Sequence, residues 1–146
     1  MVDTTKSLRR KNIPILKEAL DLLIQQFDVS ESGTHVSLET FDKTSTVHNI
    51  FNDPSYYAGN AVMDLTDISI NKLRAPTRLD FALEKANDLM FTEESGDRPG
   101  ERNVLVLFTD GHTGHKTDFA KYAKYIKDLK VTIIQLALFS QPIKII

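Results

Sequence analysis

The sequence predicts a three-layer α/β sandwich of the Rossmann type, in which helices cover both faces of a mostly parallel β-sheet. Helical and strand patterns alternate along the chain, as they do where helices cover a parallel sheet. Residues 104–108 form an unbroken apolar run, which indicates a central strand buried on both faces. The length of 146 residues suits a single domain with its own core.

The first half of the chain begins with the clearest helix. Spacings of three and four residues place one apolar stripe along residues 13–27, formed by Ile13, Leu16, Leu20, Leu23 and Phe27. Residues 36–41 alternate apolar and polar side chains, and residues 44–51 form a second such segment. We expect a hairpin joined through Asp42 and Lys43 at the edge of the sheet, because these are the more polar strands.

Two helical segments of different clarity follow the hairpin. Residues 57–68 predict an indistinct helix that contains Gly59. Residues 78–91 predict a clearer one, with Thr77 available as its N-cap. The charged, glycine-containing residues 92–102 then predict a solvent-exposed loop.

A βαβ unit closes the chain. The buried strand at 104–108 is followed by a loop, a helix over residues 119–129 and a parallel strand over residues 131–138. Such a crossover is expected to be right-handed.

Composition excludes several classes of function. The formal charge of −2 argues against a surface built for nucleic acid or an anionic membrane. The absence of cysteine removes disulfides, thiolate metal sites and cysteine nucleophiles. Apolar runs stay well short of the roughly 20 residues that a membrane helix needs, and no signal-peptide pattern follows Met1. These features are expected of an intracellular protein or of a piece of a longer one.

Three predicted strand-end loops carry oxygen-bearing side chains where open parallel sheets bind ligands. Residues 3–7 read D-x-T-x-S, Thr77 precedes a helix, and residues 109–111 read T-D-G. Two carboxylates and three hydroxyls, without nitrogen or sulfur, select a hard cation: magnesium, calcium or manganese. The few neutral hydroxyls favour magnesium that retains water. Asp3 and Asp110 would offset the charge of the ion, which then seeks an anionic ligand such as a partner's carboxylate.

These motifs, in this order on an alternating α/β pattern, resemble the metal-ion-dependent adhesion site of von Willebrand factor type A domains. The resemblance implies five metal residues: Asp3, Thr5, Ser7, Thr77 and Asp110. It further implies that the three hydroxyls contact the ion directly, and that Asp3 and Asp110 act mainly through water and hydrogen bonds. A Mg²⁺ ion, with Mn²⁺ or Ca²⁺ as alternatives, would be completed by Glu or Asp of a partner protein.

The sequence departs from the family pattern at several points. Thr5 replaces the usual serine, and Arg74, Ala75 and Pro76 replace the glycines common before the site threonine. The family's first strand would precede Asp3, where only Met1 and Val2 stand, and its last helix, strand and helix are missing. We therefore expect residues 1–146 to be a single domain incomplete at both ends.

Each site residue also has a purely structural interpretation. Asp110 with Gly111 is a common turn pair, and Thr77 and Ser7 are possible helix caps. We expect His112 and His115 to lie on a polar loop rather than to bind zinc, and His35 and His48 to be ordinary surface residues. A basic cluster lies close to the motif, with Arg74 and Arg78 as further candidates; it comprises Lys6, Arg9, Arg10 and Lys11. It is either a binding surface for acidic protein, sulfated glycan or mineral-associated polymer, or simply a solvated loop and helix start.

The leading functional hypothesis is a cation-dependent adhesion or matrix-interaction module, with a secreted or extracellular setting implied by the resemblance. The alternative is a metal-independent structural module of an extracellular matrix or biomineral assembly. A magnesium-dependent hydrolase is distant, because no glycine precedes residues 4–7 to form a phosphate-binding loop and no second acid stands two residues after Asp3. We expect no enzymatic activity, no nucleic-acid partner and no membrane span.

Overall fold

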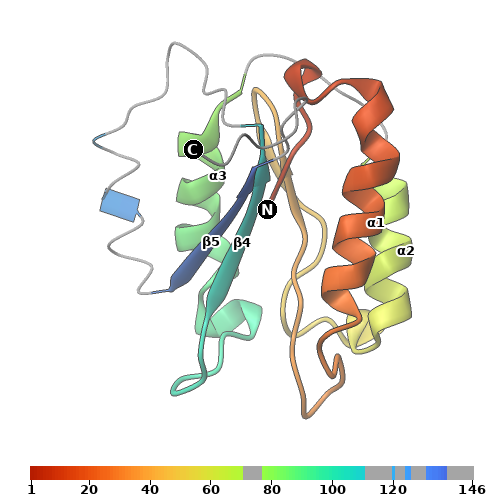
Figure 1. Cartoon of the computed structure of the whole chain (residues 1–146). Coiled ribbons are helices and arrows are strands. Elements are labelled where there is room, and N and C mark those ends of the chain that lie inside the picture. Colours follow the sequence, from red (N-terminus) through yellow and green to blue (C-terminus); the bar gives the residue numbers. More distant parts are fainter. Residues whose placement is uncertain (71–76, 111–119, 121–123, 126–130, 138–146) are drawn as a thin grey trace, which may run out of the picture.

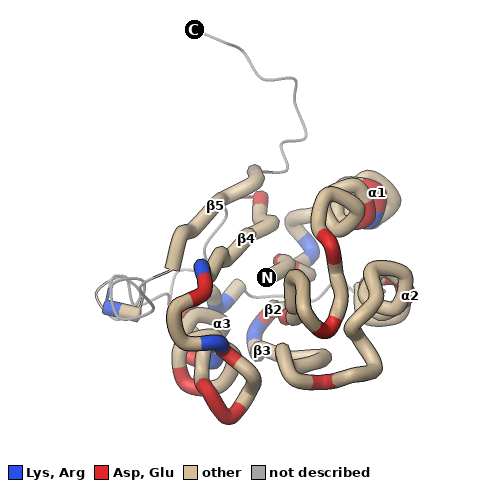
Figure 2. The backbone as a smooth tube through the Cα atoms, turned by 90° about the horizontal axis from the view of Figure 1, so that it is seen from below, with Lys and Arg blue, Asp and Glu red and all other residues tan. Residues whose placement is uncertain are grey.

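A five-stranded sheet lies between helices in the computed structural model, which describes residues 1–70, 77–110, 120, 124–125 and 131–137 (Figure 1). The strand order is β3-β2-β1-β4-β5, and every neighbouring pair except β2 and β3 is parallel. Helices α1 and α2 lie on one face and α3 on the other (Figure 2). The predicted fold class is confirmed. The elements are β1 (Val2–Asp3), α1 (Ile13–Ile24), β2 (Glu39–Phe41), β3 (Ser45–Val47), α2 (Gly59–Ser69), α3 (Leu79–Lys85), β4 (Val104–Thr109) and β5 (Thr132–Ala137).

The two-residue strand β1 occupies the centre of the sheet. Val2 pairs with Thr40 of β2 on one side and with Phe108 of β4 on the other. Both pairings are parallel, so the three strands end at the same edge of the sheet. This arrangement brings the residues that follow β1, β2 and β4 together.

Apolar side chains form one cluster on each face of the sheet. Leu16 and Leu20 of α1 pack with Val2 and Phe108 on one face. Leu83 of α3 belongs to the cluster on the opposite face, together with Phe41, Leu105 and Leu107 of the sheet. The predicted stripe of α1 is buried at its centre, whereas Phe27 lies beyond the helix end and is 48% exposed.

The hairpin forms as expected, but only β3 is an edge strand. The antiparallel pair β2 and β3 is shorter than the predicted segments, and β2 is fully buried between β1 and β3. The hairpin as a whole lies at one edge of the sheet, as predicted, with β3 as its outer strand. The polar side chains of β2 have hydrogen-bond partners within the hairpin: one carboxyl oxygen of Glu39 accepts from Ser45, and Thr40 bonds to His48.

Neither histidine of this region is an ordinary surface residue, in contrast to the sequence-based expectation. His48 is half-buried, and its burial lowers its pKa. His35 is also half-buried and stacks on Tyr57, with ring centroids 4.6 Å apart.

Helix α3 begins one residue later than predicted. Its N-cap residue is Arg78 rather than Thr77, and no side chain caps it. The backbone N–H of Arg78 instead donates to the carbonyl oxygen of Asp42, at 2.8 Å, which ties this segment to the hairpin turn. The helix continues into a π-helix over Ala86–Met90. The helix predicted over residues 57–68 is confirmed and corresponds to α2.

An apolar cavity of about 390 Å³ lies in the core next to the amino end of β1. No described strand fills this position between segments 34–38 and 102–106. Segments 34–38 and 102–106 line opposite sides of it, with Met1 and Val2 at one end. Val104 is 48% exposed and Val106 is half-buried, so burial on both faces is wrong for this half of β4. The reason is that β1 has only two residues and leaves this stretch without a neighbour in the described chain.

Several predictions fall outside the described residues, namely the arginine-to-proline segment 74–76 and the histidines His112 and His115. Of the predicted helix at 119–129, Ala120, Lys124 and Tyr125 are described, and all three are helical. Among the described residues, no helix is both long and apolar enough to cross a membrane.

Candidate metal site

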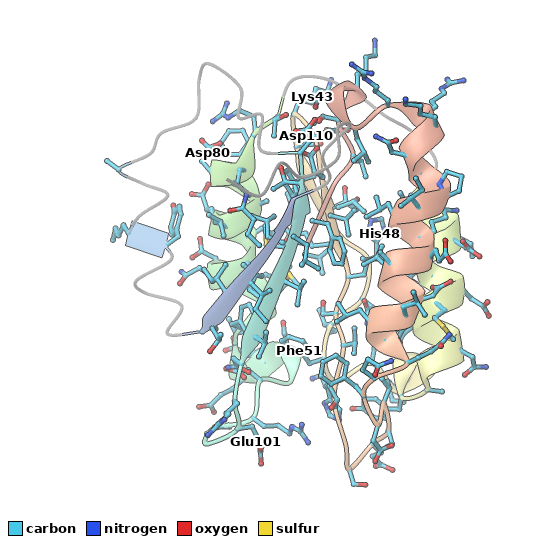
Figure 3. All side chains as sticks on the ribbon, in the orientation of Figure 1. Lys43, His48, Phe51, Asp80, Glu101 and Asp110 are labelled. Carbon is cyan, nitrogen blue, oxygen red and sulfur yellow. The ribbon has the colours of Figure 1, made fainter. Side chains whose placement is uncertain are left out.

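The candidate site lies at the edge of the sheet where β1, β2 and β4 end. The N–H of Thr4 donates to the carbonyl oxygen of Phe41 at 2.9 Å, so the first motif runs beside the end of β2. Asp110 directly follows β4, and Figure 3 shows it at the same end of the molecule as Lys43 of the hairpin turn. The contact of Arg78 with Asp42 brings Thr77 to this edge as well.

Asp3 is held from both sides of its carboxylate. One oxygen, Oδ1, accepts the backbone N–H of Thr5 at 2.9 Å, and the other, Oδ2, accepts the hydroxyl of Thr109 at 3.0 Å. Both carboxylate oxygens are thus oriented before any ligand arrives. This geometry suits a carboxylate that acts on an ion through water or hydrogen bonds.

Electrostatics at Asp3 favour a nearby cation. Burial raises the pKa of the Asp3 carboxyl, hydrogen bonds from Thr5 and Thr109 oppose this rise, and the negative charge of Asp110 adds to it. The described chain has two side-chain ion pairs, Lys17 with Asp67 and Arg78 with Asp80, and neither neutralises Asp3. A divalent ion between Asp3 and Asp110 would relieve their repulsion.

Thr5 and Ser7 present a pair of hydroxyl oxygens 2.7 Å apart. Neighbouring oxygens around octahedral Mg²⁺ are about 3 Å apart, given Mg–O distances of roughly 2.1 Å. Thr5 is buried and Ser7 is exposed, so the pair runs from the core to the surface. The separation and the chemistry of these oxygens fit a hard cation.

The capping interpretations of the site residues are not observed. Thr5 precedes the 3-10 turn Lys6–Leu8 without a capping bond from its side chain. The next turn and α1 have Arg9 and Asn12 as their N-cap residues, so Ser7 caps neither of them. Thr77, which is 7% exposed, does not cap α3.

Arg78 pairs with Asp80 and therefore does not add a free positive charge to the basic cluster. Its guanidinium donates to both carboxylate oxygens of Asp80, at 2.8 and 2.6 Å, and lies 3.7 Å from the ring centroid of Phe81. This contact holds the pKa of the Asp80 carboxyl below its usual range. The ion pair links Arg78, the N-cap residue that follows Thr77, to the first turn of α3.

The five candidate metal ligands offer oxygen atoms only, without a nitrogen or sulfur donor. No group of three or more His, Cys, Asp or Glu side chains gathers anywhere in the described part of the chain. A site here would therefore depend on two carboxylates and on hydroxyl oxygens, which suits magnesium, calcium or manganese.

Sequence reasoning gave no role to two threonines beside the site. Thr109 begins the T-D-G motif and donates to Asp3, and the Thr4 hydroxyl donates to the carbonyl oxygen of Phe41 at 3.1 Å. Thr109 lies inside a motif already singled out, but only the folded register of β4 against β1 shows that its hydroxyl reaches Asp3.

The fold and the site together define a class of protein: an α/β domain with hydroxyl and carboxylate side chains gathered at the carboxyl edge of a parallel sheet. The sequence profile of the von Willebrand factor type A domain matches residues 1–143. The chain belongs to this family, which confirms the resemblance seen in the sequence.

Relatives and solved structures agree with this assignment. Matrilin-3 of Gallus gallus is 32% identical over 114 residues, which cover 76% of this chain and 25% of the matrilin. The chain thus spans about a quarter of the length of that relative.

Two solved structures share the fold. The structure of proximal thread matrix protein 1 from the mussel byssus, with a zinc-occupied MIDAS motif, has a TM-score of 0.80 at 16% identity and covers 93% of this chain and 36% of that chain. Manganese-loaded TRAP protein of Plasmodium vivax has a TM-score of 0.75 at 14% identity and covers 93% of this chain and 55% of that chain.

Proposed function

We propose that this domain is a divalent-cation-dependent adhesion or matrix-interaction module that binds an acidic group of a partner protein. The observation that carries the proposal is the oriented carboxylate of Asp3 beside the hydroxyl pair of Thr5 and Ser7, at the edge that Asp110 also reaches. The names of its relatives and neighbours support it: matrilins, a byssal matrix protein and a manganese-loaded protein. We also infer an extracellular setting from the matrilins.

Five residues would hold the ion: Asp3, Thr5, Ser7, Thr77 and Asp110. Thr5, Ser7 and Thr77 would contribute neutral hydroxyl oxygens, and the two carboxylates would balance its charge. We favour Mg²⁺, with Mn²⁺ or Ca²⁺ as alternatives, because oxygen donors are few. When bound, the ion supplies an electrophilic position for the carboxylate of a partner's Glu or Asp. The proposed role is binding rather than catalysis.

Metal titration tests the proposal directly. Isothermal calorimetry of the full chain with Mn²⁺, and then with Mg²⁺ and Ca²⁺, is expected to show one site that Asp110→Ala abolishes. Asp64→Ala, which removes an exposed carboxylate of α2, is the matched control and is expected to bind as the wild type does. Equal binding by the wild type and Asp110→Ala would contradict the proposal.

A metal-independent structural role is the second candidate. It is favoured by one observation: both oxygens of Asp3 already have protein donors, so the loops can be held together without an ion. Under this alternative, assembly with matrix components is unchanged by EDTA and by the double variant Asp3→Ala/Asp110→Ala. Loss of assembly in EDTA would exclude it.

A further inference from the structure

Five exposed cations lie in the segments next to the candidate metal site, and we call them the basic rim: Lys6, Arg9, Arg10, Lys11 and Lys43. Lys6 lies inside the first motif, between Thr5 and Ser7. Arg9, Arg10 and Lys11 follow it in the turns that lead into α1. Lys43 lies across the site in the turn between β2 and β3, at the same end of the molecule as Asp110 (Figure 3). Cations therefore flank the motif on two sides.

The side chains of the basic rim have no hydrogen bond or ion pair with any described residue. Several described cations outside the rim do have partners: Lys17 pairs with Asp67, Lys85 donates to the Ser45 carbonyl, and Arg98 donates to the Gly33 carbonyl. The rim is thus a concentration of unneutralised positive charge in a chain whose formal charge is −2.

The fold itself does not require this charge. The first turn of α1 contains no acidic residue, although a helix N-terminus favours negative side chains and disfavours cations. Arg9 has φ of 60°, a left-handed conformation that is unfavourable for a residue other than glycine. Leu8, which is 1% exposed, anchors the turn in the core, whereas its charged neighbours are exposed. Strained or unfavourable features of this kind are often retained for binding.

We propose that the basic rim binds further acidic side chains of the same partner segment whose carboxylate completes the metal site. The partner is then a polypeptide segment with several Asp or Glu residues, not one with a single acid. This inference rests on the proposed function. An extended segment crossing the metal motif would pass between Lys43 and the cations before α1, and it projects alternate side chains to the same side about 7 Å apart. Acids at alternate positions can therefore reach the metal and the rim together.

The interaction is electrostatic and solvent-exposed, so salt should weaken it. Exposed charges are screened over about 8 Å at physiological ionic strength. The rim is therefore expected to increase affinity strongly at low salt and weakly at high salt, whereas the contact between a carboxylate and the metal depends on the ion itself.

Two labelled peptides separate these contributions. Both are glycine- and serine-rich nonamers, one with a single central Glu and the other with three Glu at alternate positions. In Mg²⁺ and low salt, fluorescence anisotropy with the full chain is expected to show binding of the three-Glu peptide at least about tenfold tighter. Arg10→Gln/Lys11→Gln is expected to cut that advantage to about threefold or less. The control, Arg102→Gln/Lys124→Gln, removes two exposed cations outside the rim and should retain it.

The outcomes distinguish this inference from the proposed function. Failure of the single-Glu peptide to bind in Mg²⁺ contradicts the metal-dependent contact, whereas residual, salt-sensitive binding of the three-Glu peptide in EDTA still supports the rim. Equal affinities for both peptides, or an unchanged advantage in Arg10→Gln/Lys11→Gln, overturn the inference. A sulfated heparin oligosaccharide that binds through the rim while the three-Glu peptide shows no advantage also overturns it, in favour of a glycan partner.

Discussion

At the scale of single residues, Asp3 shows how the site is organised without a ligand. Its carboxylate is completely buried, and each oxygen accepts one hydrogen bond, one from Thr5 in the segment after β1 and one from Thr109 at the end of β4. A buried carboxylate is costly unless such donors are present. The donors therefore have two effects: they permit the charge to be buried, and they fix the direction in which it faces.

Thr109→Val tests the role of the donor on β4. The substitution keeps the shape but removes the hydroxyl that donates to Asp3, so one buried carboxylate oxygen loses its partner. We expect the free energy of unfolding to fall by about 1–3 kcal/mol, and Mn²⁺ affinity to fall with it. Urea denaturation and calorimetry measure the two effects.

The matched control for this variant is Thr46→Val on the edge strand β3, where the side chain is exposed. It is expected to change stability little. If Thr109→Val behaves like Thr46→Val in both measurements, the hydroxyl of Thr109 does not support Asp3.

At the scale of elements, a buried carboxyl lies in the hairpin close to where the hairpin contacts α3. Glu39 of β2 is 0% exposed and accepts a hydrogen bond from Ser45 of β3, while Lys85 of α3 donates to the Ser45 carbonyl at 2.9 Å. The second carboxyl oxygen of Glu39 has no partner within the described chain. Burial raises the pKa of Glu39 to about 7, against smaller opposing contributions from Ser45, the amino terminus and Lys85.

Glu39 should make stability depend on pH. Because its pKa is higher in the folded state than the ordinary value of 4.5, the fold favours the protonated acid. Its favourable contribution is complete below pH 4.5 and is lost as pH rises to about 7. Glu39→Gln does not titrate, so it does not lose this contribution. As the pH rises from 4.5 to about 7, the free energy of unfolding of the variant minus that of the wild type is expected to increase by roughly 2–3 kcal/mol.

Denaturation midpoints at several pH values between 4 and 8 measure this difference. Glu18→Gln, which changes an exposed carboxyl of α1, is the control and should follow the wild type across the range. A difference between Glu39→Gln and the wild type that does not vary with pH would contradict the assignment.

At the scale of the whole molecule, the cavity beside β1 leaves part of the core unfilled. The Met1 amino group donates to the Val106 carbonyl at 2.8 Å, and the Phe108 N–H donates to the Met1 carbonyl at 2.9 Å. Even-numbered residues of β4 therefore direct their backbone groups toward β1. The backbone groups of Val104 and Val106 therefore face the cavity, whose walls are largely apolar.

An extended aliphatic segment joined to the amino end of Met1 is expected to stabilise the domain. It would bury apolar side chains in the cavity, pair with β4, and replace an amino group whose pKa burial lowers to about 6. We expect four or five β-branched residues to raise the melting temperature by at least about 5 °C. They should also slow hydrogen exchange at the Val106 amide.

A glycine- and serine-rich segment of the same length is the control, because it also removes the charged amino group but buries little apolar surface. It should give a smaller increase in melting temperature. If the two segments have the same effect, the cavity does not accept a strand.

The sequence by itself determined the fold class, the order of most elements and the family, because these follow from local periodicity and from short motifs. It also identified the candidate metal residues, since Asp3, Thr5 and Ser7 lie within one short segment and the T-D-G motif follows an evident strand. It did not find the internal position of β2 or the exposure of Val104.

Only the tertiary structure decided these features, because each depends on which strands become neighbours. Burial of β2 follows from its pairing with β1 and β3, and Thr109 reaches Asp3 only through the register of β4 against β1. The same holds for the cations. Arg78 is taken up by Asp80, whereas the basic rim remains unpaired within the described chain. Long-range pairing leaves no local pattern in a sequence, so the partners of a buried charge or an exposed cation become visible only in the folded chain.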